Sequence, residues 1–537
     1  MSVRENSAEY DVESHFEKEE EQGGLNGLHR DLKNRHIAMI SLGGVIGTGL
    51  FLGTATSLHN GGPAGLLLGY AVIASVVISI TNTLGEMIAY LPLPGGHIKL
   101  GERFVGSAAS FAMGYNYWYN WTILLPTELS AAAVLMNYWV SSEQVSNAVW
   151  ITIFLVIAIG INLFGAKAYG EAEFWFASIK ILLVIGLIIL GVIIDAGGVP
   201  TDKGNVIGVK YWIDPGPWAQ YMDIPGATGR FLGFFSVLLN ATFAFIGTEI
   251  VGIAAGEASN PRRNIPKALK KVYVRLIVFY IVGTFIIGLL VPSNDPEIAT
   301  STGTAKSSPF VIAITRANIK VLPHIVNACL VSSAWSASSS DLYISSRALY
   351  GLALAGNAPK IFTRVNRWGL PYVAMLFCSA FALLAYMGVN SGSNTVFMWF
   401  ADMTSICGLI TWYFIAITYL RFYKGMMAQG IDRSTLPFKC WGQPYVAIYV
   451  LVVLTIVLLF GGFQVFLHNH WDTATFVTTY LPLPVAPLLY FGYKFVKKTK
   501  TIAPSEMDFY SGLAEIEKLA EQEARPTTLM GQFFDAL

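Results

Sequence analysis

The stretch Gly43-Gly-Val-Ile-Gly-Thr-Gly49, continued by Leu50-Phe51, places four glycines within seven residues of an apolar run. Each glycine inside a helix costs roughly 1 kcal/mol relative to alanine. The stretch therefore predicts either close helix packing through small residues or a helix that is interrupted in mid-membrane. An interruption would expose backbone N–H groups at one helix start and carbonyl groups at the other helix end.

A similar stretch recurs two hundred residues later, as Phe243-Ala-Phe-Ile-Gly-Thr-Glu249. The Gly-Thr pair at 47–48 lies in the first apolar run of the chain, and the pair at 247–248 lies in the sixth. Two five-helix repeats, each opening with an interrupted helix, would produce this spacing. N–H groups at such an interruption suit a carboxylate and carbonyls suit an ammonium, so an amino acid zwitterion fits both.

The composition predicts an all-α membrane protein. Of the 537 residues, 54% are hydrophobic and only 13% are charged, whereas a soluble domain typically carries about 25% charged residues. A membrane-spanning helix needs roughly 20 mostly apolar residues. Twelve runs meet this requirement: 37–58, 64–90, 108–139, 148–166, 172–195, 231–257, 269–291, 322–346, 371–389, 394–420, 444–463 and 474–496.

The basic residues predict that both termini are cytoplasmic. With the amino terminus inside, most of the 35 Lys and Arg residues fall on the inner side, as the positive-inside rule requires. Lys180 lies near mid-depth in a predicted span. The acidic first 35 residues do not resemble a removable signal peptide. The Lys and Arg residues on the outer side are Lys203, Lys210, Arg230, Lys306, Arg316 and Lys320.

Several function classes are excluded by what the sequence lacks. No basic stripe is interleaved with aromatic residues, so nucleic acid is not an expected partner. The four cysteines show no CxxC spacing, so neither a metal site nor a disulfide framework is expected. We find no nucleophile–base pair, and we expect a protein that is not an enzyme and holds no cofactor.

Four segments resemble the fungal amino acid permeases of the amino acid–polyamine–organocation superfamily. The resemblance extends from about residue 30 to 500. It implies an inverted 5+5 repeat with two extra helices, and uptake of amino acids coupled to protons at the plasma membrane. The segments are GGVIGTGLFLG (43–53), AYGEAEFWFASIK (168–180), FAFIGTEIVGIAAGEASNPRRNIPKA (243–268) and DLYISSRALYGLA (341–353).

The resemblance also implies which residues bind the substrate. Residues 47–49 would meet the carboxylate through backbone N–H groups and the Thr48 hydroxyl. The carbonyls of Val45, Phe243 and Ile246 would accept the ammonium, and the Phe243 ring would cover the site. The predicted substrate-binding set is Val45, Gly47, Thr48, Gly49, Phe243, Ile246, Gly247 and Thr248.

Two charged residues are the predicted proton-coupling groups. A cation at the depth of Lys180 costs at least 2.5–3.5 kcal/mol on insertion scales, and a buried lysine shifts its pKa readily. Lys180 could otherwise extend to the membrane interface or form an ion pair without functional consequence. Glu249 either carries a proton or holds the interruption together by accepting backbone N–H bonds.

Three further residues are candidates for the site. Glu128 either contacts substrate or makes a hydrogen bond between helices. Ser336 and Ser339 lie in a run of small and hydroxyl residues that suits tight helix packing, or they surround the Lys180 region. Glu171 and Glu173 open the fifth span, where a helix start favours acids without any functional role.

The expected function is proton-coupled import of amino acids, neutral and over a broad range. An amino acid or polyamine exchanger is the first alternative, and a nutrient sensor that does not transport is the second. The tails are expected to be mobile, with Lys18 and Lys33 open to ubiquitin ligase machinery. We expect a tail at 1–35, a ten-helix core at 36–422, two accessory helices at 423–499 and a tail at 500–537.

Overall fold

The structure, a computed structural model, describes residues 39, 47–93, 95–202, 204–250, 269, 272–299, 308–366 and 369–513. All regular secondary structure in these residues is helical. A helix satisfies its interior backbone N–H and C=O groups within one segment, which a lipid environment requires. The all-α class predicted from the sequence is confirmed.

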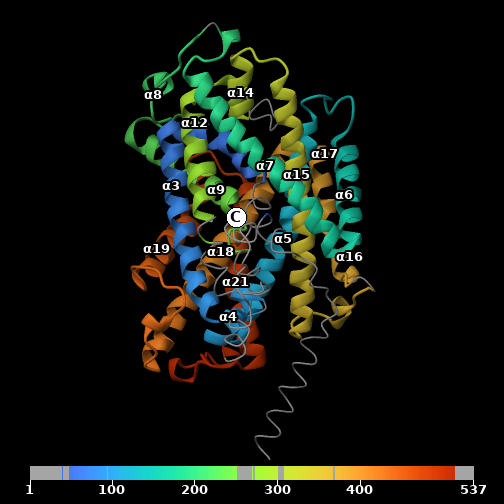
Figure 1. The fold of residues 1–537 in the computed structure, drawn as a ribbon, viewed down its shortest axis with the longest axis vertical. Coiled ribbons are helices and arrows are strands. Elements are labelled where there is room, and N and C mark those ends of the chain that lie inside the picture. Colours follow the sequence, from blue (N-terminus) through green and yellow to red (C-terminus); the bar gives the residue numbers. More distant parts are fainter. Residues whose placement is uncertain are drawn as a thin grey trace, which may run out of the picture.

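The longer helices occupy the apolar runs found in the sequence and lie roughly side by side along the long axis of the molecule (Figure 1). They are α3 (Gly53–Tyr90), α5 (Ser107–Met136), α6 (Asn147–Leu163), α7 (Gly165–Asp195), α9 (Gly226–Phe245), α12 (Gly283–Leu290), α15 (Leu322–Leu354), α16 (Tyr372–Ala380), α18 (Ser393–Ala428), α19 (Tyr445–Phe460), α20 (Thr473–Tyr480) and α21 (Pro482–Lys497). The shorter elements are η2 (Thr48–Leu50), α4 (Gly96–Phe104), η3 (Pro200–Asp202), α8 (Lys210–Ile213), η4 (Tyr221–Asp223), η5 (Leu276–Val282), α13 (Pro296–Ala299), α14 (Pro309–Arg316), η7 (Lys360–Thr363), η8 (Phe381–Met387), α17 (Gly388–Ser391), η9 (Arg433–Thr435), η10 (Phe463–Phe466) and η11 (Pro504–Glu506).

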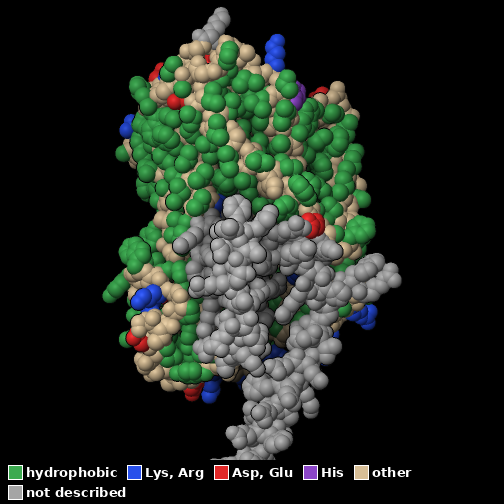
Figure 2. Space-filling model, viewed as in Figure 1, with side chains coloured by type: hydrophobic (Ala, Val, Ile, Leu, Met, Phe, Trp, Pro, Cys, Tyr) green, Lys and Arg blue, Asp and Glu red, His purple; other side chains and the backbone are tan. Residues whose placement is uncertain are grey.

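Six helical stretches of the described residues are long and apolar enough to cross a membrane: Thr48–Tyr90, Ala168–Asp202, Gly226–Phe245, Val272–Leu290, Ser393–Ala428 and Thr473–Lys497. The outer helices expose large apolar side chains, such as Val156 on α6 and Leu182 on α7. Figure 2 shows one face on which hydrophobic side chains form a broad surface, with most charged side chains toward its ends. A lipid-facing surface accounts for this distribution.

Helices α5 and α15 are absent from these six because they carry many polar residues. The polar side chains of α5 include Asn116, Asn120 and Glu128, and α15 contains the serine-rich segment 332–341; most of these side chains are buried. Buried helices of this kind contact other helices instead of lipid. Their polarity therefore marks the interior of the molecule.

Helix α3 joins the first two predicted spans across a kink. Gly62 has a φ of 71° and a ψ of 177°, and Pro63 follows it. A Cβ on Gly62 would lie 2.7 Å from both the Ala219 backbone nitrogen and the Pro217 carbonyl oxygen, so only glycine fits this approach. The predicted loop at 59–63 is therefore a sharp bend in one helical element.

The carboxy-terminal segment 499–513 packs against the molecule, at the end opposite α8 and α14 (Figure 1). Phe509 is completely buried, and its ring contacts Phe104 of α4 and Phe422 of α18 with centroids 5.2 and 5.4 Å away. Arg103 forms an ion pair of 2.7 Å with Asp508. The prediction of a mobile tail from residue 500 is therefore wrong for 500–513, because Phe509 supplies an apolar anchor.

Hydrogen bonds hold Asp508 in its ionised form. Burial alone would raise the pKa of this carboxyl, but bonds from Ser511 and Arg103 lower the pKa to about 2. A carboxyl whose folded pKa is depressed contributes stability above its ordinary pKa, and loses it as the pH falls through the folded value. The segment therefore stays attached throughout the neutral range.

We expect Phe509→Ala to lower the free energy of unfolding by about 3 kcal/mol, because it removes a fully buried aromatic side chain. The neighbouring Tyr510 is 62% exposed, so Tyr510→Ala should change stability by about 0.5 kcal/mol or less. Thermal unfolding of the detergent-purified protein measures both. Equal melting temperatures for the two variants would contradict the packing role of Phe509.

Candidate functional site

The sixth apolar run is interrupted in the structure. Helix α9 ends at Phe245, Ile246 leaves helical geometry (φ −55°, ψ 143°), and helix resumes at Ile250. Gly247 has a φ of 89°, a conformation that favours glycine. Among the described residues no backbone N–H caps the last carbonyls of α9. The interruption predicted here is present.

The first apolar run also departs from helical geometry. Gly47 is extended (φ −105°, ψ −157°), η2 follows it as a single 3₁₀ turn, and α3 begins at Gly53. Met39, before the glycine-rich stretch, is helical. Residues 40–46 lie outside the described residues, so the predicted role of the Val45 carbonyl is not tested.

The two interrupted segments lie against each other. A Cβ on Gly49 would lie 2.8 Å from Ala244 Cα and 2.9 Å from Phe243 Cδ1, so η2 packs directly on the end of α9. The Phe243 ring meets Phe397 of α18 edge-on, with centroids 5.7 Å apart. On the same helix α18, a Cβ on Gly408 would lie 3.1 Å from Ile246. Helix α18 therefore forms a wall beside the interruption.

A carboxylate already occupies the backbone donors of the first interruption. Glu128 Oε1 accepts hydrogen bonds from the Thr48 hydroxyl at 3.2 Å and from the Thr48 backbone N–H at 3.4 Å. A Cβ on Gly47 would lie 2.5 Å from the same oxygen. In the described part of the chain, Oε2 of Glu128 has no hydrogen-bond partner. This end of η2 can hold a carboxylate, which is the role predicted for residues 47–49.

Glu249 lies in the second interruption and is almost fully buried. Its Oε2 accepts a hydrogen bond of 3.1 Å from the Trp412 indole of α18. The carboxylate lies beside the backbone N–H groups of Gly247 and Glu249, and Arg275 of the following helix interacts with it electrostatically. Thr248 donates to the Phe245 carbonyl at 3.2 Å. Polar side chains thus form hydrogen bonds with some of the backbone groups that the interruption leaves unpaired.

The buried polar residues Thr48, Glu128 and Glu249 at the two interruptions form one polar centre. Lys180 forms a second polar centre, between α7 and α15. It is 0% exposed, and its Nζ lies 3.6 Å from Glu173 Oε1 on the same helix. The other oxygen of Glu173 accepts hydrogen bonds from Ser336 at 2.6 Å and from Ser340 at 3.3 Å. The Lys180 side chain therefore does not extend to a membrane interface, and it has a buried counter-charge.

The remaining candidates surround this centre. Asn162 donates to the Ser339 hydroxyl at 3.0 Å, so Ser339 bonds α6 rather than Lys180. Asp341 of α15 is buried and interacts electrostatically with Glu128, Lys180 and Glu173. The two polar centres are therefore electrostatically connected.

Three participants were not predicted from the sequence. Glu173 was expected at a helix start, yet it lies two turns from Lys180 on one face of α7, and the seven-residue spacing was the available signal. Arg275 was counted with the cytoplasmic charges because it follows Lys270 and Lys271. Asp341 gave no separate signal within its serine-rich run.

The described residues contain no cluster of three or more His, Cys, Asp or Glu side chains suited to a metal ion. Buried donors and acceptors dominate the two centres instead. The arrangement offers donors suited to a carboxylate and carbonyls suited to an ammonium, and its acids interact electrostatically with one another.

The chain is similar to known permeases over most of its length. A family model described as amino acid permease matches residues 36–503. The chain is 43% identical over 502 residues to the dicarboxylic amino acid permease of Saccharomyces cerevisiae, covering 93% of this chain and 82% of that protein. It is 43% identical over 501 residues to the proline-specific permease of Emericella nidulans, with 92% and 90% covered. The lysine-specific permease of Saccharomyces cerevisiae is 40% identical over 529 residues, with 98% and 85% covered.

Glu173→Gln should destabilise the protein by about 3 kcal/mol, because it removes the carboxylate that pairs with the buried Lys180 ammonium. The double variant Glu173→Gln, Lys180→Met removes both charges and should recover most of the loss. Thermal unfolding of the purified variants measures this double-mutant cycle. Glu143→Gln, in an exposed loop, is the control. A single variant as stable as the parent would show that the pair is not coupled.

Proposed function

Because the chain belongs to the amino acid permeases of the amino acid–polyamine–organocation superfamily, we propose that it imports amino acids across the plasma membrane by proton symport. The chain is a multi-pass membrane protein that transports amino acids. Proton coupling, substrate range and orientation are our proposal. The single observation that carries it is the Glu128 carboxylate held by the Thr48 N–H and hydroxyl.

The Glu128 contact suggests how the carboxylate of the substrate binds. A substrate carboxylate would use the same Thr48 donors, and it would have to displace an ionised Glu128. A proton on Glu128 removes the charge that competes for these donors and weakens its two charge-assisted hydrogen bonds. Substrate and proton therefore bind together more readily than either binds alone, which is the thermodynamic requirement of symport.

The ammonium of the substrate would bind at the second interruption. The last turn of α9 presents carbonyl groups without a backbone cap in the described part of the chain. These carbonyls form the negative end of a helix dipole. We assign the ammonium to the carbonyls of Phe243 and Ile246, with Gly247 and Thr248 forming the turn beside it.

The balance of buried charges supports proton binding. Among the described residues around the two polar centres, the buried carboxyl groups are Glu128, Glu173, Glu249 and Asp341, and the buried cations are Lys180 and Arg275. A buried ionised carboxylate without a partner is strongly disfavoured. The excess of carboxyl groups over cations supports proton binding in the region that contains Lys180.

The proton gradient is a sufficient energy source. A proton gains about 2.3 kcal/mol per 100 mV of membrane potential and about 1.36 kcal/mol per pH unit. With roughly 100 mV and two pH units the total is about 5 kcal/mol, enough to concentrate a neutral amino acid several-thousand-fold. Neutral substrates are favoured because Phe243 and Phe397 supply an uncharged wall.

The proposed topology places twelve spans and an inverted 5+5 repeat in the chain, with both termini cytoplasmic. The core is 36–422, the accessory helices are 423–499, and the end of the molecule that carries α4 and 499–513 faces the cytoplasm. The amino-terminal tail, including Lys18 and Lys33, lies outside the described residues. Its attachment to ubiquitin ligase machinery stays a proposal.

Uptake of the twenty radiolabelled amino acids in a permease-deficient cell tests the substrate class. We expect saturable uptake of several neutral amino acids, and accumulation that rises about tenfold for each unit of external acidification. A protonophore should abolish accumulation. Uptake that ignores the protonophore and is accelerated by internal amino acid would identify an exchanger, and absence of any uptake would favour a sensor.

Lys180→Ala should abolish accumulation against a gradient in proteoliposomes, because the proton-linked charge is lost from the buried centre. Substrate binding, measured by thermal stabilisation of the purified variant, should persist. Lys99→Ala is the matched control, since Lys99 pairs with Glu102 in an exposed position. Accumulation by Lys180→Ala equal to that of the parent would contradict the coupling role.

A further inference from the structure

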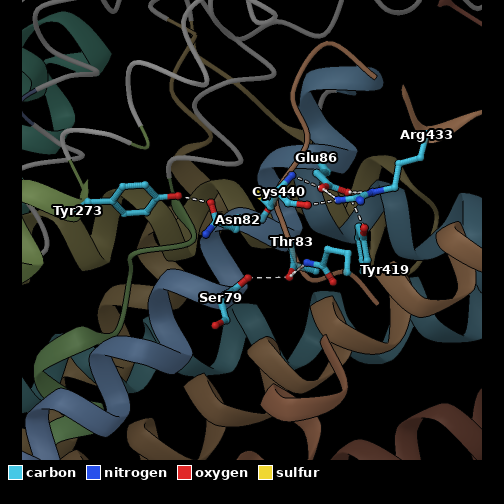
Figure 3. Close-up of polar contacts among 9 residues, drawn as sticks. Ser79, Asn82, Thr83, Glu86, Tyr273, Tyr419, Arg433 and Cys440 are labelled. Carbon is cyan, nitrogen blue, oxygen red and sulfur yellow. Dashed lines mark hydrogen bonds and ion pairs between the residues drawn. The ribbon is translucent and has the colours of Figure 1, made fainter. Parts of the chain in front are cut away.

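The Glu86 carboxylate, near the end of α3, is completely buried and accepts hydrogen bonds from α18 and from the loop 429–444 (Figure 3). Arg433 donates to both oxygens, from Nε to Oε2 at 3.2 Å and from Nη2 to Oε1. The Tyr419 hydroxyl donates to Oε2, and the Cys440 backbone N–H donates to Oε1. We call Glu86, Tyr419, Arg433 and Cys440 the Glu86 junction.

Neighbouring contacts extend the junction to further elements. Gln443 of the loop donates to the Thr83 hydroxyl of α3 at 3.0 Å. The Tyr273 hydroxyl, in the helical stretch Val272–Leu290, donates to the Asn82 side chain. Figure 3 shows these residues around the last turns of α3, with Tyr273 beside Asn82 and Arg433 on the opposite side, beside Glu86. The end of α3 near Glu86 therefore forms hydrogen bonds with three other parts of the chain: α18, the loop 429–444 and the stretch Val272–Leu290.

Gly85 lets these elements approach so closely. A Cβ at this position would lie 2.7 Å from Leu269 Cδ1 and 3.2 Å from the Phe438 ring. A larger side chain would force the Leu269 side chain and the Phe438 ring to shift. The junction is thus a close-packed contact as well as a set of hydrogen bonds.

The joined elements are the ones that flank the candidate site. Helix α3 continues from η2, and the stretch Val272–Leu290 follows the second interruption. Helix α18 touches that interruption through Gly408 and Trp412. Tyr419 lies seven residues beyond Trp412, on nearly the same face of the helix. One stripe of α18 therefore contacts both the site and the junction.

We propose that Glu86, Arg433 and Tyr419 are positioning residues that hold the exit of the transport pathway closed at the proposed cytoplasmic end. This inference rests on the proposed function, because it takes the joined end of α3 and α18 as the end at which substrate leaves the site. Release of substrate requires the two helices to separate, and the junction then breaks.

The surroundings of the two charges suit repeated breaking. The Arg433 side chain is 25% exposed, so water can solvate it once it leaves Glu86. Glu86 has no such access, and its carboxylate favours the joined state through charge-assisted hydrogen bonds. A buried ion pair adds little net stability compared with an apolar pair. A role in setting the closed conformation accounts better for its presence.

Cys440 is a natural reporter of the junction. Its backbone N–H and carbonyl bond Glu86 and Arg433, and its Sγ lies 3.8 Å from the Asn82 carbonyl oxygen. Burial, together with the Glu86 charge, raises the pKa of the Cys440 thiol to about 12. Little thiolate is present while the junction is joined, so maleimide reacts slowly. Separation hydrates the thiol and increases its reactivity.

The first test measures alkylation of Cys440 in detergent-purified protein whose other cysteines are replaced (Cys329→Ser, Cys378→Ala, Cys407→Ala). We expect Glu86→Gln to increase the alkylation rate about tenfold, because a neutral amide loses the charge-assisted bonds to Arg433. Glu102→Gln is the matched control, since Glu102 forms an exposed pair with Lys99 at the same end of the molecule. Arg433→Lys replaces Glu86→Gln where the latter fails to fold.

The second test compares both transport directions in proteoliposomes, with the amino acid taken up fastest in the panel above. A variant that opens more readily at the cytoplasmic end spends less time open at the other end. The KM for uptake should therefore rise severalfold while the KM for efflux falls. A loss of correctly folded protein would lower the maximal rates and leave both KM values unchanged.

Unchanged alkylation of Cys440 in Glu86→Gln would overturn the inference. Faster alkylation with equal KM changes in both directions would also overturn it, because the junction would then only anchor the loop. The alkylation test needs no transport, so it still decides whether the junction is a closed contact if the symport proposal fails. Symport is tested separately by the protonophore and by Lys180→Ala.

Discussion

The structure depends on one constraint: a backbone polar group away from water must find a partner inside the protein. Where α9 ends at Phe245, backbone carbonyls lack partners within the helix. Neighbouring residues supply some of the missing hydrogen bonds. Thr248 bonds the Phe245 carbonyl, and Glu128 bonds the Thr48 N–H across from the other interruption. The last carbonyls of α9 have no backbone cap in the described part of the chain, whereas the Thr48 donors are held by Glu128. In the proposed function a zwitterion uses both ends, with its carboxylate replacing that of Glu128.

The same constraint applies to charged side chains that are buried. Lys180 is tolerated in the interior because Glu173 lies beside it, and Glu173 is in turn held by Ser336 and Ser340. This chain of contacts couples α7 to α15. A proton added or removed within it changes the balance of several buried groups at once, since Asp341 interacts with both Lys180 and Glu128. In the proposed function, proton binding and substrate binding therefore share one electrostatic network.

Sequence reasoning located the helices and the interruption at Gly247, because hydrophobic runs and clustered glycines act locally. It did not find the partners that folding brings together. Glu86 and Arg433 are separated by 347 residues, and neither has an unusual neighbourhood in the sequence. The packing of Phe509 was hidden in a polar tail, where one apolar residue gives no periodic signal. Long-range pairing is set by tertiary packing, which a single sequence does not display.

Helix α18 explains how the site and the cytoplasmic end act as one unit. An α-helix rises about 1.5 Å per residue, so Trp412 and Tyr419 are about 10 Å apart along a nearly rigid rod. Glu249 holds Trp412 at one point and Glu86 holds Tyr419 at the other. If α18 tilts, its contact with Glu249 and its contact with Glu86 change together. In our proposal, closure of the exit is thus sensitive to how the second interruption is filled, which would link occupancy of the site to access from the proposed cytoplasmic end.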